Sequence, residues 1–101
     1  MTRKKGEMTD MDRYEEGIRQ NADKYSVVGF RPGSGMETMR IFTGDQLPHA
    51  IAYAKILMKE RVNRLRSAMI YALDEYNHHA LVGTVDEFNP DTFKEVKVKY
   101  K

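Results

Sequence analysis

Three histidines are the first residues in this sequence with the chemistry of a general base or a metal ligand near neutral pH: His49, His78 and His79. His78 and His79 are adjacent, so on a strand their side chains would point to opposite faces. His49 has no histidine or carboxylate four residues later, as a metal-binding pair on a helix requires. The pattern therefore favours histidines exposed on a loop and on a helix surface. We predict no catalytic residue and no metal ligand.

Two pairs of neighbouring carboxylates, Asp74 with Glu75 and Asp86 with Glu87, flank the adjacent histidines. A hairpin around those histidines could bring the pairs near each other, which gives one alternative function, a small hydrolase-like enzyme. Paired carboxylates do acid–base chemistry when burial of one member separates their pKa values. All four lie at predicted strand ends beside turns, where water is close, and no serine, threonine or lysine has an activating partner. An enzyme is therefore the third choice of function class.

Closely spaced glycines in residues 31–35, Arg-Pro-Gly-Ser-Gly, raise the question of phosphate binding. A phosphate-binding loop needs Gly-Lys followed by Ser or Thr at the start of a helix, whereas Gly35 is followed by Met36 and a predicted strand. The segment is typical of a hairpin turn. The chain also has no cysteine, which excludes disulfides, thiolate zinc sites and a thiol nucleophile. We expect no cofactor.

The densest basic run is the feature that best suits binding, and it consists of Lys55, Lys59, Arg61, Arg64 and Arg66. Such a run can hold the phosphates of a nucleic acid, which makes nucleic-acid binding the second choice of function. Three observations weigh against it: the pI is 8.9, the run contains no aromatic residue for stacking, and residues 74–91 are acidic. We predict that this charged patch contacts a partner.

Length and composition place these residues in one small globular domain. The chain has 101 residues, of which 41% are hydrophobic and 32% charged, so one core is expected. The N-terminus has no apolar stretch after its basic residues, and no segment approaches the roughly 18 uninterrupted apolar residues of a membrane span. We therefore expect a cytoplasmic protein that does not enter a membrane.

The first half of the chain predicts a helix, a hairpin and a second helix. Residues 1–8 are expected to be disordered, and residues 9–24 to hold an accessory helix of about Asp10 to Asp23, capped by Thr9. Residues 25–30 and 36–43 read as two strands joined by a loop of about five residues. A main amphipathic helix begins near Asp45, with capping residues in 43–45, Pro48 in its first turn and an apolar stripe from Leu47 to Val62.

The apolar residues in 63–76 fit both a helical periodicity and the alternation of a strand. A helical stripe would extend the main helix beyond 30 residues, which is improbable in a domain this short, so we favour a strand over residues 67–75. Residues 80–86 then form a strand with a bulge at Gly83, and residues 95–101 form a final strand whose lysines protect a sheet edge. Residues 25–101 are thus predicted to be an α+β domain of α-ββ-α-βββ order, a small antiparallel sheet with the main helix across one face.

The favoured function is a small non-enzymatic protein-binding or regulatory module, of the kind that bacteria and phages use. Its partner is expected to be another protein or a second copy in a homodimer. The charge lies in separate blocks, which suits complementary docking, and the seven methionines provide adaptable apolar contacts.

Overall fold

The computed structural model describes residues 10–96 and confirms an α+β fold. Its elements follow the order helix, two strands, helix and three strands, with a short 3₁₀ turn after the second helix. The predicted disorder of residues 1–8, the Thr9 cap and the outer part of the final strand lie outside the described residues. The first helix, α1(Asp10–Gln20), begins at the expected residue and ends three residues earlier than predicted.

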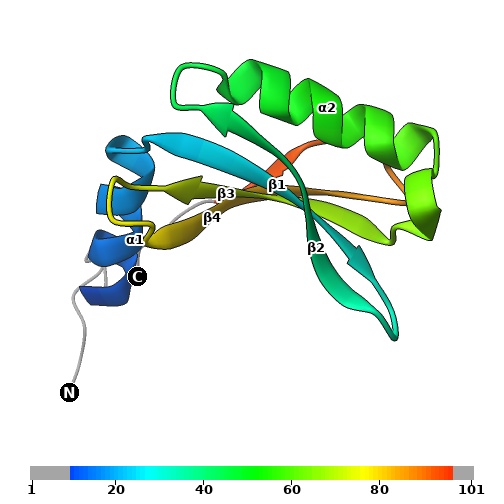
Figure 1. Ribbon diagram of the computed structural model, residues 1–101, viewed down its shortest axis with the longest axis horizontal. Helices are drawn as coiled ribbons and strands as arrows, with labels where there is room; N and C mark the ends of the chain where they lie inside the picture. The colour runs from blue at the N-terminus through cyan, green and yellow to red at the C-terminus, as the bar shows by residue number, and fades with distance from the viewer. Residues whose placement is uncertain (1–9, 97–101) are drawn as a thin grey trace, which may run out of the picture.

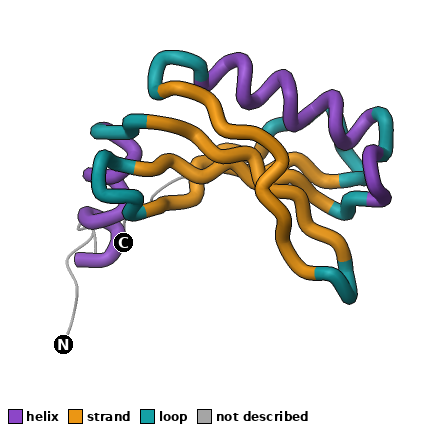
Figure 2. Tube along the Cα trace, viewed as in Figure 1, coloured by secondary structure: helices purple, strands orange, loops and turns teal. Residues whose placement is uncertain are grey.

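The predicted hairpin is present as β1(Lys24–Arg31) and β2(Gly35–Thr43), which pair antiparallel. The loop between them is shorter than expected, because Arg31 and Gly35 already face each other as the last pair. Gly33 holds a left-handed φ of 83°, which glycine adopts without a steric penalty. The hairpin extends past the rest of the sheet in Figures 1 and 2.

The main helix is α2(Leu47–Lys59), so it begins two residues later than predicted and ends before Val62. The expected cap is wrong in detail: Gln46 holds the capping position without a side-chain hydrogen bond to the helix. The Thr43 hydroxyl instead donates to Asp45 Oδ1 at 2.6 Å, so neither side chain reaches the helix amides. Pro48 does lie in the first turn, where its missing N–H costs little.

The ambiguous region after α2 contains a 3₁₀ turn, η1(Val62–Arg64), and then the strand β3(Ser67–Leu73), as favoured. It is followed by β4(His79–Asp86) and β5(Lys94–Glu95). A bulge is present, but the unpaired residue is Val82, next to the predicted Gly83. Gly83 is instead required by close packing, since a Cβ there would collide with Phe93 Cζ and lie 2.6 Å from Phe93 Cε1.

The five strands form one antiparallel sheet in the order β2-β1-β3-β4-β5. Helix α2 lies along one face, and α1 packs at the end of the sheet where β3 turns into β4 (Figure 1). The core lies between α2 and the sheet, where Val27, Ala68 and Ile70 are fully buried beneath Ala50 and Ala54. Alternation along the strands sends every second side chain to the opposite face, which α2 does not cover.

Candidate functional site

Asp74, Glu75 and His78 belong to the turn between β3 and β4. Asp74 follows β3, and its Oδ1 accepts the backbone N–H groups of Tyr76 and His78, both at 2.9 Å. The Nδ1 of His78 lies 3.0 Å from Asp74 Oδ2. Desolvation is the largest influence and raises the pKa of the Asp74 carboxyl, but the hydrogen bonds from His78 and Tyr76 together outweigh it, so the pKa lies below its ordinary value. The carboxylate therefore stabilises the β3–β4 turn.

The two carboxylate pairs lie at opposite ends of the β3–β4 hairpin. The register pairs Leu73 with His79 at one end and Ser67 with Asp86 at the other, so Asp74 and Asp86 are separated by the length of the strands. The register therefore does not bring the two carboxylate pairs near each other. Among residues 10–96 no group of three or more His, Asp or Glu side chains is placed to hold a metal ion.

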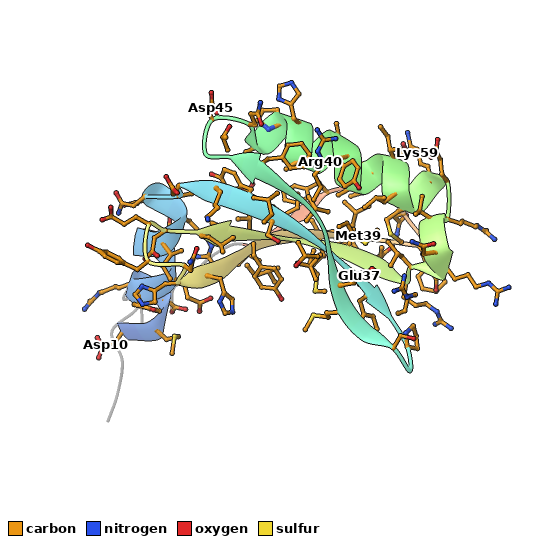
Figure 3. All side chains as sticks on the ribbon, viewed as in Figure 1. Asp10, Glu37, Met39, Arg40, Asp45 and Lys59 are labelled. Carbon is orange, nitrogen blue, oxygen red and sulfur yellow. The ribbon has the colours of Figure 1, made fainter. Side chains whose placement is uncertain are left out.

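The basic run divides into two parts. Lys55 and Lys59 lie on α2, and Lys59, labelled in Figure 3, forms an ion pair with Asp91. Arg61, Arg64 and Arg66 follow the helix and surround a hollow of about 340 Å³. These three arginines are called the basic cluster below.

The basic cluster includes a side chain that is distant in sequence. Phe88, which follows β4, lines the same hollow as the three arginines, together with Leu65 and Glu87. Phe88 is 81% exposed, the largest exposed fraction among the large hydrophobic residues of the described range 10–96. The sequence showed no aromatic residue within the basic run, so only the fold brings one beside it. An aromatic residue within the polar turn segment 86–91 was the one available signal.

The backbone of the basic cluster adopts an uncommon conformation. Arg61, Asn63 and Arg64 have φ angles of 50°, 52° and 58°, all in the left-handed region. That region costs a residue other than glycine roughly 1 to 3 kcal/mol, less for Asn, and it persists only where surrounding contacts compensate. The hydrogen bonds from Arg64 N–H to Arg61 O and from Arg66 N–H to Phe30 O hold the segment in place.

A second candidate surface is the face of the sheet opposite α2, here called the open face. It consists of the side chains of β1 to β4 that point away from the helix. The register places Ser26 opposite Ile41 and Tyr71, and Val28 opposite Thr38 and Met69. The remaining members are Phe30, Met36, Ser67, Leu73, His79, Leu81, Thr84, and the end residues Lys24, Thr43 and Asp86.

The open face is apolar at its centre and exposed at one edge. Met36 and Ile41 on β2 are 63% and 56% exposed. Helix α2 lies on the other face, and α1 contacts β3 and β4 at the end of the sheet. A shallow hollow of about 280 Å³ lies on it, lined by Val28, Met36 and Tyr71 among others. Its charged members are Lys24 and Asp86, at opposite ends of the strands. The sequence indicated this surface because the apolar residues of β3 occupy both its even-numbered and its odd-numbered positions, so both faces of the strand are apolar.

Comparison with known proteins adds no functional information. A scan against family models matches none of them, and searches of curated proteins and of solved structures return no similar protein. Within residues 10–96, no helix has both the length and the apolar character needed to cross a membrane.

Proposed function

We propose that this protein is a non-enzymatic protein-binding module whose partner is a second copy of itself, joined through the open face. The observation that carries the proposal is a sheet face that α2 does not cover, with apolar side chains on four adjacent strands and Met36 and Ile41 exposed on β2. Apolar side chains that stay in water contribute nothing to folding, whereas sheet-on-sheet packing would bury them in a layer about 10 Å thick.

The charge of the open face suits pairing with an identical face. Its central rows contain no Asp, Glu, Lys or Arg, so two copies do not repel each other there. The charged members Lys24 and Asp86 lie at opposite ends of the strands, outside these rows, and Asp86 is already paired with Lys94 of its own copy.

The size of the open face suits a reversible dimer. Four strands spaced about 4.8 Å apart, each with seven residues at about 3.4 Å per residue, span roughly 450 Å² in projection. Two such faces bury about 900 Å², close to the approximately 1,000 Å² that marks a specific interface. We therefore expect an association that depends on concentration in the micromolar range.

The proposal also places the protein in the cytoplasm, with which the absence of cysteine is consistent. Dimerisation would cover the open face, which the monomer exposes, and this change would give the protein a regulatory role. Helix α2 and the basic cluster are separate from the open face and stay exposed in such a dimer.

Sedimentation equilibrium of the full chain between about 1 and 200 μM tests the proposal. We expect the mean mass to rise from that of a monomer to that of a dimer. Met36→Lys and Ile41→Lys place like charges on both faces and should keep the protein monomeric, with circular dichroism confirming the fold. The matched control is Ile56→Lys, because Ile56 is 49% exposed on α2, away from the open face.

Two results would overturn the proposal. One is a wild-type protein that remains monomeric over the whole range, which would leave the open face to another occupant. The other is an association that Ile56→Lys disrupts and the β2 substitutions do not, which would place the interface on α2.

A further inference from the structure

The hollow at the end of α2 is lined by arginine guanidinium groups and by an exposed aromatic residue. We propose that Arg61, Arg64 and Phe88 bind single-stranded nucleic acid, with an unpaired base stacked on Phe88 and the arginines on the flanking phosphates. Guanidinium groups bind phosphate oxygens with two parallel hydrogen bonds, and an aromatic ring stacks on any base. The residues that line the site are not members of the open face, which the site adjoins at Asp86, and the proposal does not depend on dimerisation.

The ion pairs at this end of the sheet leave positive charge available. Asp86 bonds Lys94 at 2.9 Å, Glu87 pairs with Arg66 at 3.4 Å, and Asp91 pairs with Lys59. The acidic segment that argued against nucleic acid is therefore largely neutralised here, while Asp74 and Glu75 lie at the far end of the hairpin. Glu60 is adjacent to the cluster in sequence and exposed, without an ion pair among the described residues.

Two arginines are left for a ligand. Among residues 10–96, neither Arg61 nor Arg64 has an ion-pair partner, and both are exposed. Both also hold the left-handed backbone that glycine would adopt more easily. Arginine at two such positions is explained if the two side chains, which line one hollow, bind a ligand there.

The loop that carries Phe88 is fixed before any ligand binds. Asp86 Oδ1 accepts the backbone N–H groups of Phe88 at 3.0 Å and Asn89 at 2.9 Å, while Oδ2 accepts from Lys94 Nζ. The backbone is therefore held while Phe88 is 81% exposed. A preorganised platform binds with a smaller entropic cost than a flexible one.

The shape of the site favours a single strand over a duplex. The hollow of about 340 Å³ lies at the lower end of the range for ligand pockets, roughly 300 to 1,000 Å³, and is far smaller than a double helix. Phe88 can stack only on a base that is free of its neighbours and its complement, and duplex bases are paired and stacked.

Fluorescence anisotropy of the full chain with labelled dT15 and rU15, each at about 50 mM salt, tests the proposal. A 15-base-pair duplex and a free mononucleotide are added as competitors, to distinguish binding of a single strand from binding of a duplex or of a single nucleotide. We expect tighter binding of a single strand than of either. Phe88→Ala should weaken binding about 5-fold to 150-fold, and Phe88→Trp should retain it. Combined Arg61→Ala and Arg64→Ala should lower the slope of log affinity against log salt by about 1.4.

The controls are an exposed aromatic and an exposed arginine at the opposite end of the sheet. Tyr76→Ala removes the ring of a residue that is 72% exposed, and Arg13→Ala removes a side chain that is 64% exposed; neither should change affinity. The proposal is overturned if neither strand binds at low salt, if the duplex or the mononucleotide binds as well as the strand, or if Phe88→Ala binds as wild type. Equal weakening by the control variants would also overturn it.

Discussion

Gly83 offers the sharpest test of how β5 packs on β4. A Cβ added at this position would lie 2.6 Å from Phe93 Cε1 and 2.7 Å from the backbone oxygen of Lys94. The ring can turn away, but the carbonyl belongs to β5, which pairs with Gly83 and Thr84. Gly83→Ala must therefore displace β5 and weaken the hydrogen bond from Val96 N–H to Val82 O, now 2.9 Å.

The expected loss for Gly83→Ala is roughly 1 to 3 kcal/mol of unfolding free energy, the usual cost of forcing a methyl group into a packed site. Urea unfolding followed by circular dichroism measures it, and an unchanged m-value would show that only stability changed. Gly17→Ala is the matched control. Gly17 is helical and has nothing within 4 Å of an added Cβ, so the same substitution should stabilise by about 0.5 to 1 kcal/mol.

A double-mutant cycle with Phe93→Ala separates the two contacts. If the ring causes most of the clash, Gly83→Ala should cost less in the Phe93→Ala background, and the remainder reports the backbone contact with Lys94. A Gly83→Ala protein as stable as wild type would refute the packing of β5 against β4 described above.

Three further predictions concern the core, acid stability and the β2 edge. Ile70→Ala, at a fully buried site, should lower the unfolding free energy by about 2 to 5 kcal/mol in urea titrations, and Ile56→Ala, half exposed on α2, by much less. The Lys94 hydrogen bond is the largest influence that lowers the pKa of Asp86 from 3.8, so its carboxylate stabilises the folded state above that value and the contribution is lost as pH falls through the lower folded pKa. Asp86→Asn should therefore be less stable near neutral pH and show a shallower stability loss below about pH 4 in pH-dependent urea titrations. Arg40→Met should lower the free energy of unfolding by about 0.5 to 1 kcal/mol, measured by thermal unfolding. The Arg40 guanidinium (Figure 3) lies 4.9 Å from the ring centre of Phe42 and 5.7 Å from that of Tyr53.

The elements of this fold could be predicted largely from local pattern. Alternating apolar residues placed the β1–β2 hairpin and β3, and the stripe from Leu47 placed α2. The exact start of α2 could not be predicted, because Thr43 bonds Asp45 instead of the helix amides, and that choice depends on how the chain enters the helix. The bulge lies one residue from the predicted position, because Gly83 pairs with Ile70 and is required instead for its close approach to Phe93, a tertiary contact that local pattern does not reveal.

The candidate sites also have features that could be predicted from the sequence and features that depend on the fold. The basic run was visible in sequence because charge is a property of each residue, and so was the absence of a cysteine or a phosphate-binding loop. Only the tertiary structure decided that Phe88 lies beside Arg61 and Arg64, and that Asp74 and Asp86 lie at opposite ends of a hairpin. Those relations depend on strand register, which is set by side chains packing across the sheet and not by neighbours along the chain.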